Sequence, residues 1–546
     1  MNGPPANPRT RADVWLLLAF CGFLFFYGLG AFGLLGADEP RYAQVAREML
    51  ERSDWVTPTL LGKPWLEKPV LYYWEAMLSF RAGGVSDWAA RAPSAVDAAI
   101  LIVAVYFFLR RFRPGSELDG ALIAASCAGV VGFARAAATD MPLAAGFSIA
   151  LLAWYAWRES GSRIYLAAFY VFLALATLAK GPVAPALSGV IILLFIALKR
   201  DWRAILGTLW IPGILLYFLV MLPWYVAVQL RNPEFFRVFI LEHNLARFSQ
   251  DAYHHRQPFW FYLPVFLLAM MPWAVVFIAV VVERVRLIWS EGKESYSAAE
   301  DSWSLFLLIW TFVPVLFFSA SQSKLPGYIL PAVPAGALLV ADYLSSRRAG
   351  PRDENRANEH RGFSLLFGAA HGILCGLLLF GAISAPSIVL NHRLLWGTGT
   401  CVAAAVGLVF ALGMAAALLS RLGLRLLRPA TMLAVVVSVG IVIRFAGPAI
   451  DDAQSARPVA ESILSFSHEP VPIAVYHLNR LKEYGLEFYL NRAAESYENG
   501  PIPQEAHVVV APQNAQAQVA EMVPGRRVSY LTTIAAQKVD LYWVGK

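Results

Sequence analysis

Long apolar runs alternate with short polar segments over most of the chain. Many of these runs approach the roughly 20 residues that a helix needs to cross a hydrocarbon core of about 30 Å. We predict thirteen spans, at approximately 14–35, 91–109, 118–135, 141–157, 164–180, 183–198, 207–229, 259–282, 303–320, 327–344, 363–385, 394–419 and 430–447. The third, fifth and sixth are short or interrupted by Gly and Pro, so the count is expected to within one or two. The pattern predicts a polytopic α-helical membrane protein.

The pattern changes after the last span. From about 449 to 546, polar turns separate short β-like runs at 472–476, 506–510 and 539–544, with helical stretches between them. Strands that alternate with helices are typical of α/β domains. We therefore predict two parts, a transmembrane domain over 1–448 and a small α/β domain over 449–546.

Basic residues predict the orientation in the membrane. Clusters of Arg and Lys at 9–11, 110–113, 199–203, 347–361 and 421–428 all fall on one side of the predicted bundle. The positive-inside rule makes that side cytoplasmic, together with the N-terminus. The loops 36–90 and 230–258 and the tail are then periplasmic, and a bacterial inner membrane is expected. The first run is too long for a signal peptide core, so it is expected to be retained.

Composition excludes several classes of protein. Hydrophobic residues make up 58% of the 546 positions and charged residues only 15%, which does not fit a soluble globular chain. Topology explains the net charge of +7, and no basic face with interleaved aromatics indicates nucleic acid. The four cysteines lie in apolar stretches without CxxC spacing. No P-loop, GxSxG, HExxH or DxD motif is present, so a soluble nucleotide-sugar donor is not expected.

Two adjacent carboxylates, Asp38 and Glu39, stand where the first span ends, just before Pro40. Either side chain can cap the helix that Pro40 is expected to begin. Alternatively, the pair carries chemistry at the membrane surface. Residue type alone leaves both explanations open.

Further along the same loop, Glu67 and Lys68 lie among Trp and Tyr residues. Aromatic residues at this depth are usual for an interfacial belt. A charged pair among them tends to face a cavity, where Lys68 can hold a lipid phosphate.

Four further residues at outer positions are candidates for the site. Asp140 begins the fourth span close to Arg135, and a structural salt bridge competes there with a role at a cavity. His243 follows span seven, and with Glu67 it can form a zinc site or remain without a metal. Lys180 and Lys324 lie on the outer side, against the positive-inside trend, which makes them phosphate-binding candidates.

Several motifs together resemble the lipid A aminoarabinose transferases of the GT-C superfamily, which also contains the protein O-mannosyltransferases. These motifs are Asp38-Glu39-Pro40-Arg41-Tyr42, Arg47-Glu48-Met49, Lys63-Pro64, Glu67-Lys68-Pro69, Thr139-Asp140, Lys180-Gly181-Pro182, Glu242-His243 with Arg247-Phe248, and Lys324-Leu325-Pro326-Gly327-Tyr328. They run in order from residue 36 to about 331. One departure is Val70, where many relatives carry a second proline.

The resemblance implies the reaction and its partners. The donor is 4-amino-4-deoxy-L-arabinose on undecaprenyl phosphate, the acceptor is a lipid A phosphate, and the result is resistance to polymyxin. A monomer among membrane lipids is expected, without nucleic acid. The resemblance requires no cofactor, although Glu67 and His243 form a metal site in some members.

The resemblance also implies residue roles. Asp38 is the principal catalytic carboxylate and Asp140 the second, while Lys68 and Arg247 hold the carrier phosphate. The remaining substrate-binding residues are Glu39, Arg41, Tyr42, Lys324 and Tyr328.

The acceptor decides what Asp38 does. A serine hydroxyl needs a general base, whereas a lipid A phosphate is already anionic at neutral pH. For lipid A, Asp38 instead orients the acceptor, stabilises positive charge on the sugar, or pairs with its ammonium group.

Two other functions stay open. One is transfer of mannose or a related sugar to protein or another envelope acceptor, on the same fold and residues. The other is a lipid or sugar transporter, which should place charges near the bilayer midplane. The charges here gather in outer loops and at span ends, which favours an extracytoplasmic enzyme.

Overall fold

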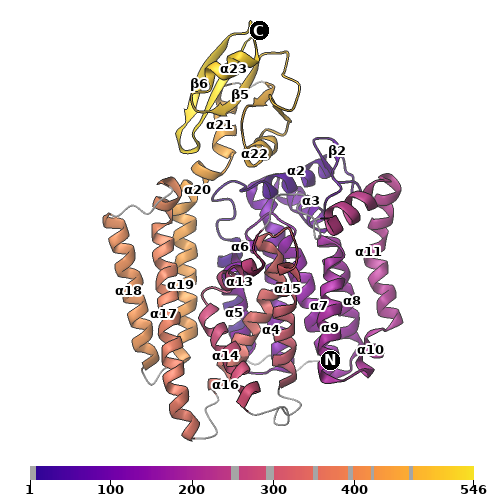
Figure 1. The fold of residues 1–546 in the computed structure, drawn as a ribbon, viewed down its shortest axis with the longest axis vertical. Helices are drawn as coiled ribbons and strands as arrows, with labels where there is room; N and C mark the ends of the chain where they lie inside the picture. The colour runs from indigo at the N-terminus through magenta and orange to yellow at the C-terminus, as the bar shows by residue number, and fades with distance from the viewer. Residues whose placement is uncertain are drawn as a thin grey trace.

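A computed structural model shows a helical bundle with a small sheet domain at one end (Figure 1). It describes residues 8–246, 257–290, 301–348, 354–391, 397–419, 424–466 and 471–545. The elements of the first half are α1 (Pro8–Cys21), the π-helix η1 (Gly22–Phe26), α2 (Asp38–Glu51), α3 (Leu71–Gly83), α4 (Asp87–Phe112), α5 (Glu117–Ser126), α6 (Ala128–Ala134), α7 (Asp140–Ser160), α8 (Arg163–Lys180), α9 (Val183–Lys199), α10 (Arg203–Thr208), α11 (Ile211–Arg231) and η2 (Arg237–Ala246). The second half of the bundle contains η3 (Phe259–Phe261), α13 (Tyr262–Ala269), α14 (Ala274–Ser290), α15 (Asp301–Ser319), η4 (Pro326–Ala332), α16 (Val333–Arg348), α17 (Glu354–Asn391), α18 (Thr398–Leu419), α19 (Leu424–Ile441), η5 (Val442–Ala446) and α20 (Gly447–Gln454).

The prediction of a polytopic helical protein is confirmed. Within the described residues, 8 helices are long and apolar enough to cross a membrane, or up to 10 when each of two bent helix pairs counts as one span. The pairs are α5 with α6, bent by 65°, and 259–269 with 274–284, bent by 117°. Helices occupy all thirteen predicted intervals, but the count of thirteen spans is not established, because several of these helices are too short or too charged.

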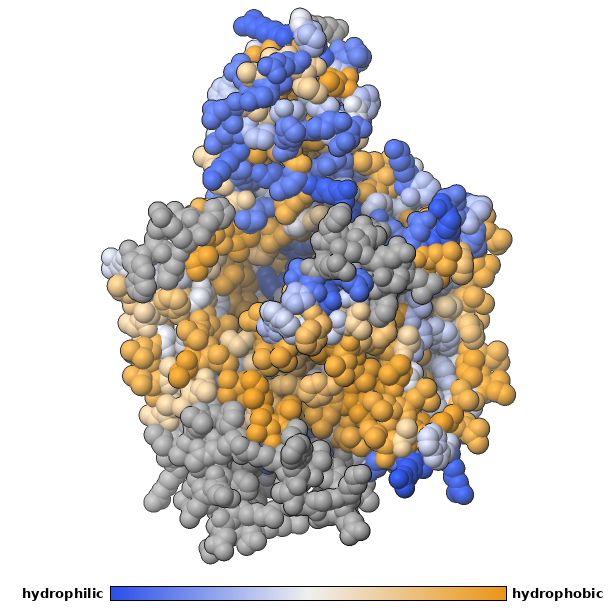
Figure 2. All heavy atoms as spheres, viewed as in Figure 1, coloured by the Kyte–Doolittle hydropathy of each residue, from blue (hydrophilic) through white to orange (hydrophobic). Residues whose placement is uncertain are grey.

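The bundle has an apolar surface. Figure 2 shows a broad hydrophobic zone over the helices on the face in view and a largely polar surface on the sheet domain. On α11, for example, Leu219 is 71% exposed and lies among other exposed Leu and Phe side chains. Such a face is stable in lipid and unfavourable in water. This chain is therefore a multi-pass membrane protein.

The first predicted span ends earlier than expected. Helical structure stops at Phe26, and residues 27–37 form a loop above the bundle instead of the last third of a helix. Gly28 and Gly36 have φ values of +65° and +66°, which L side chains rarely adopt. Hydropathy alone cannot detect this exit, because the loop is itself largely apolar.

The outer loop 36–90 is compact. It contains α2, a small hairpin of β1 (Thr59–Leu60) and β2 (Lys63–Pro64), and α3. Buried residues of α2, including Tyr42, Val45 and Met49, pack on α3 in a shared apolar cluster. The helix that was expected to begin near Pro40 is therefore present as α2, and it packs on α3.

The C-terminal domain is a five-stranded mixed sheet. Its elements are α21 (Arg457–Phe466), β3 (Ile473–Val475), α22 (Arg480–Leu490), β4 (Ala494–Ser496), β5 (His507–Pro512), α23 (Gln516–Met522), β6 (Val528–Ile534), the 3-10 helix η6 (Ala535–Gln537) and β7 (Val539–Val544), and the strand order is β4-β3-β5-β7-β6. Strand β3 pairs in parallel with β4 and β5, whereas β7 is antiparallel to β5 and β6. The three predicted strands are confirmed as β3, β5 and β7. The pattern missed β4, which is very short, and β6, which is only half-buried.

Candidate active site

Asp38 begins α2 and faces outward. Its side chain is 53% exposed and forms an ion pair with Arg41, one turn later. Ala37 is the N-cap residue, and no side chain makes a capping hydrogen bond there. The capping explanation therefore does not hold for Asp38, although its charge at a helix N-terminus is favourable.

Arg41 is enclosed by aromatic rings. Its guanidinium carbon lies 5.3 Å from the ring centroid of Tyr42, 5.0 Å from that of Trp65 and 5.5 Å from that of Tyr484 in α22. Burial acts to lower the pKa of Arg41, but nearby Tyr42, Asp38 and Glu67 raise it above its ordinary value. The guanidinium is thus a fixed positive charge between Asp38 and Glu67.

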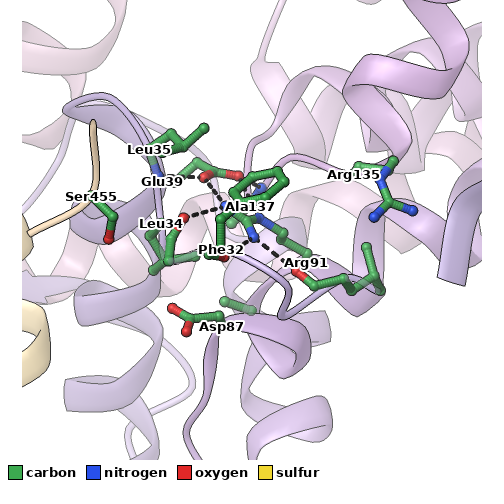
Figure 3. A network of polar contacts seen from close by, with 12 residues as sticks. Phe32, Leu34, Leu35, Glu39, Asp87, Arg91, Arg135, Ala137 and Ser455 are labelled. Carbon is green, nitrogen blue, oxygen red and sulfur yellow. Dashed lines mark hydrogen bonds and ion pairs between the residues drawn. The ribbon is translucent and has the colours of Figure 1, made fainter. Parts of the chain in front are cut away.

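Glu39 points the other way, into the protein (Figure 3). Only 8% of the residue is exposed. Its carboxylate accepts hydrogen bonds from Arg91 Nε and Nη2 at 3.1 and 2.7 Å and from the amides of Leu35 and Ala137 at 2.7 Å each. The resemblance assigned Glu39 to substrate binding, but its carboxylate already accepts four hydrogen bonds from the protein. This geometry favours a role for Glu39 in positioning the start of α2.

The hairpin positions Glu67 and Lys68. Glu48 on α2 accepts hydrogen bonds from Thr59 Oγ1 at 2.7 Å and from the amides of Leu61 and Gly62 at 2.6 and 3.1 Å. This carboxylate ties the hairpin turn to the helix that carries Asp38. Glu67 and Lys68 follow directly in the bend before α3.

Asp140 meets Lys180, not Arg135. Oδ1 of Asp140, at the start of α7, lies 2.5 Å from Nζ of Lys180, at the end of α8. Arg135 instead donates to the carbonyls of Leu24, Tyr27 and Gly28. The expected Arg135 pairing is therefore wrong, because two spans bring together residues that are 40 positions apart.

The segment 326–332 closes over this pair. Nζ of Lys180 lies 5.0 Å from the ring centroid of Tyr328. Gly327 packs so closely that a Cβ atom there would lie 2.4 Å from Oδ1 of Asp140. Glycine at this position permits the contact.

A cavity of about 420 Å³ joins these groups. Its polar lining includes Glu67, Lys68, Lys180, His243 and Tyr328. Its apolar walls are formed by Leu143, Pro182, Val183, Ala186, Phe239, Phe317 and Phe318. The cationic side chains can bind the phosphate of a lipid phosphate, and the apolar walls can contact its hydrocarbon chain.

Lys324 lies beside the cavity and not in its lining. Lys324 is buried and donates to the carbonyl of Ser321 at 2.5 Å, in a neighbouring recess of about 600 Å³. Ser321 lines both spaces, so Lys324 lies behind the cavity wall. Arg247 lies outside the described residues.

The expected zinc pair is close but incomplete. Nε2 of His243 lies 3.7 Å from Oε1 of Glu67. Zinc sites in proteins use three or four protein ligands. Within the residues that the structure describes, no group of three or more His, Cys, Asp or Glu side chains is placed to hold a metal. The described residues do not fit a resident zinc ion.

Some site residues were not anticipated. Arg91 is buried in the first turns of α4 and contacts Glu39, and Glu48 appeared in the sequence only as part of a motif. An arginine among the alanines of an apolar run is the signal that could have drawn attention to Arg91.

The residues 13–239 match the family described as dolichyl-phosphate-mannose-protein mannosyltransferase. The full-length fold is similar to the crystal structure of ArnT from Cupriavidus metallidurans bound to undecaprenyl phosphate, with a TM-score of 0.75, 21% identity and coverage of 97% of this chain and 98% of that one. A protein of Pseudomonas aeruginosa (strain UCBPP-PA14), named undecaprenyl phosphate-alpha-4-amino-4-deoxy-L-arabinose arabinosyl transferase, is 33% identical over 347 residues. The chain is similar in sequence to the aminoarabinose transferases, and its fold is similar to that of ArnT.

The similarity to these transferases is partial in length. The match covers 62% of this chain and 61% of the Pseudomonas protein. A transferase of the same name from Aeromonas hydrophila is 31% identical over 386 residues, which is 68% of this chain and 66% of that protein. The resemblance seen in the motifs is confirmed as a similarity to proteins of that name, and the fold likeness extends over nearly the whole chain.

Proposed function

We propose that this protein is a glycosyltransferase that moves 4-amino-4-deoxy-L-arabinose from undecaprenyl phosphate to a phosphate of lipid A. The observation that carries the proposal is the cavity in which Lys68, Lys180 and His243 face apolar walls. The names of the relatives support the sugar and its carrier. Lipid A as acceptor and the resulting polymyxin resistance follow from the family resemblance.

The site suits a displacement at the anomeric carbon. The bond from that carbon to the carrier phosphate breaks, and a bond to an acceptor phosphate oxygen forms. The departing undecaprenyl phosphate keeps the electron pair, and Lys68 stabilises its charge within the apolar cavity. No proton needs to be removed from an anionic acceptor.

The carboxylates act on the sugar side. Asp38 is exposed at the start of α2, where it can pair with the sugar ammonium group or with developing positive charge at the anomeric carbon. Asp140 is held in place by its ion pair with Lys180, which lines the cavity. The ion pair with Arg41 orients Asp38. No step requires a metal at Glu67 and His243.

We further propose that the protein works as a monomer in the bacterial inner membrane, with the cavity and the C-terminal domain on the periplasmic side. The positions of the basic clusters support this orientation.

The experiment is complementation of a strain that lacks its own aminoarabinose transferase. The readouts are lipid A mass, polymyxin resistance and transfer rates of the purified protein. Asp38→Asn should lower kcat at least 100-fold, and Lys68→Met should lower kcat and raise the KM for the donor. Asp452→Asn and Lys63→Met, both at exposed positions, are the matched controls.

Two results would count against the proposal. A folded wild type that leaves lipid A unmodified but glycosylates a hydroxyl acceptor favours the protein-glycosylation alternative, which the family match over 13–239 supports. Full activity in both site variants shows that the cavity is not the active site.

A further inference from the structure

The apolar loop between η1 and α2 contacts the C-terminal domain. Its backbone over residues 28–36, here called the entry segment, leads directly into Asp38. A second set of residues, Asp451 in α20 with Arg457 in α21 and Tyr489 in α22, reaches the same backbone from outside. We call these three residues the clamp.

The membrane domain holds the entry segment by its carbonyl groups. Arg91 donates from Nη1 to the carbonyls of Leu29 and Phe32 and from Nη2 to that of Gly33, each at 2.8 Å. The same guanidinium binds Glu39, whose carboxylate also accepts the Leu35 amide. Arg91 therefore connects the segment to the first turn of α2.

The clamp holds the same segment by its amide groups. The Gly33 amide donates to Oδ1 of Asp451 at 2.8 Å, and the Leu34 amide donates to the hydroxyl of Tyr489 at 2.7 Å. Gly33 is thus fixed on both sides, by its carbonyl at Arg91 and by its amide at Asp451. A Cβ atom at Gly33 would lie 2.1 Å from Ser455 Oγ and 2.5 Å from the Tyr489 hydroxyl, so only glycine fits.

Asp87 connects the clamp to the inner network. Its Oδ1 accepts the Tyr489 hydroxyl at 2.6 Å, and its Oδ2 accepts Arg457 Nη1 at 2.8 Å. Arg457 also pairs with Asp451. Asp87 and Arg91 are one turn apart on α4 (Figure 3). Within one turn of α4, Asp87 therefore binds the C-terminal domain and Arg91 binds the entry segment.

We infer that the C-terminal domain is part of the active-site framework, and that Tyr489, Arg457 and Asp451 are positioning residues for Asp38. The inference rests on the proposed function for the role of Asp38. The clamp immobilises the entry segment, which fixes where α2 begins and where its first carboxylate points. Buried hydrogen bonds of this kind hold one geometry, because each unmade bond leaves a buried donor or acceptor unsatisfied.

The test uses the full-length protein with Tyr489→Phe, which keeps the ring and removes one donor and one acceptor. Tyr530→Phe is the matched control, since Tyr530 is 52% exposed on β6 and its hydroxyl contacts Thr533. We expect amide hydrogen exchange of the peptide spanning 28–36 to accelerate at least 10-fold. We expect kcat to fall about 10-fold with the donor KM within twofold, because small misplacements of a reacting group cost rate more than binding.

Gly33→Ala tests the same contact from the loop side. It should give the same accelerated exchange and the same selective loss of kcat, with the strands of the C-terminal domain still protected. Unchanged exchange over 28–36 in a folded Tyr489→Phe protein overturns the clamp, whatever reaction the enzyme catalyses. Faster exchange with unchanged kcat overturns the link to Asp38. Exchange is measured without substrate, so a wild type inactive on lipid A would reject only the proposed function.

Discussion

Gly327 illustrates how a single residue shapes the site. It lies in η4, and its missing side chain leaves room for Asp140 and Phe133 to pack against the backbone. The Asp140 oxygen nearest to it is the one that receives the Lys180 amine. The spacing of Gly327, Asp140 and Lys180 is therefore set by one close contact.

Gly327→Ala should separate this pair. The added methyl group would lie 2.4 Å from Asp140 Oδ1 and 2.9 Å from Phe133 Cζ, so the carboxylate must move. We expect transfer activity to fall at least 10-fold while the protein stays folded, measured by steady-state kinetics and thermal unfolding. Gly189→Ala on α9, where a Cβ meets open space, should be as active as wild type. Equal activities of the two variants would show that the contact has no functional role.

The sequence predicted charged residues at the site better than it predicted their partners. Glu67, Lys68 and His243 line one cavity and Asp140 pairs with Lys180 at its wall, whereas Asp38 is exposed beside Arg41. Sequence distance misled for Asp140, because its nearest basic residue along the chain points away from it. Pairing across two antiparallel spans is set by helix packing, which hydropathy does not describe.

At the scale of elements, α2 and α22 form the main contact between the two parts of the protein. Arg47 on α2 donates to the Phe488 carbonyl at 2.7 Å, and Gln44 donates to Asn491 at 3.1 Å. Within the described residues, Gln44 Oε1 and Glu487 Oε2 are both buried without a hydrogen-bond partner. A buried acceptor without a partner is costly, and protonation of the Glu487 carboxylate lowers that cost.

Glu487 should make this contact sensitive to pH. Burial, followed by the nearby carboxylate of Glu483 and more weakly those of Glu48 and Glu495, raises its pKa to about 8, although the Ala494 amide acts to lower it. An unfolded Glu titrates near 4.3, so between about pH 5 and 8 the native state binds the extra proton. The free energy of unfolding should therefore fall as pH rises through this range and become level above it.

Glu487→Gln should remove this slope and stabilise the C-terminal domain at pH 8 by about 1–3 kcal/mol, since each pKa unit corresponds to about 1.4 kcal/mol. Denaturation midpoints at pH 5.5, 7 and 8 measure the effect. Glu521→Gln on the exposed face of α23 is the control and should follow wild type. Parallel pH profiles for Glu487→Gln and wild type would contradict a protonated Glu487.

Helices and strands were predictable from the sequence where a long run of residues follows a single hydrophobic pattern. The apolar runs gave α4, α8, α11 and α15 closely, since a long lipid-facing helix needs little beyond hydropathy. The hairpin β1–β2 was missed, because two residues per strand carry no periodic signal. Its stability comes from the Glu48 carboxylate, a contact between segments that no local pattern reveals.

At the scale of the whole molecule, polar and apolar surfaces divide the protein into a lipid-embedded part and an outer part (Figure 2). Glu67 and Lys68, which line the cavity, come from the outer loop that contains α2 and α3, and these helices lie at the end of the bundle that carries the sheet domain (Figure 1). The basic segment at 199–203 lies at the opposite end, beside α10 (Figure 1). The arrangement agrees with the orientation that we propose.

Single cysteines should report this orientation. Among the native cysteines only Cys401 is exposed, so Cys401→Ser gives a suitable background. We expect Glu521→Cys to react with a membrane-impermeant maleimide in cells whose outer membrane is permeabilised. Arg203→Cys should react only after lysis. The reverse pattern would place the cavity in the cytoplasm.

The hydrogen bonds that hold Gly33 on both sides have a consequence for the synthesis of the protein. Its amide partner Asp451 lies 418 positions later in the chain, and the Tyr489 partner of Leu34 lies 455 positions later. The ribosome therefore makes the entry segment long before its partners. A nascent chain that stops before Asp451 already contains most of the helices of the bundle, yet it lacks the acceptors of the Gly33 and Leu34 amides. Synthesis of residues 451–489 is thus the event that completes the framework around Asp38, and chains that stop before Asp451 should consume no donor lipid.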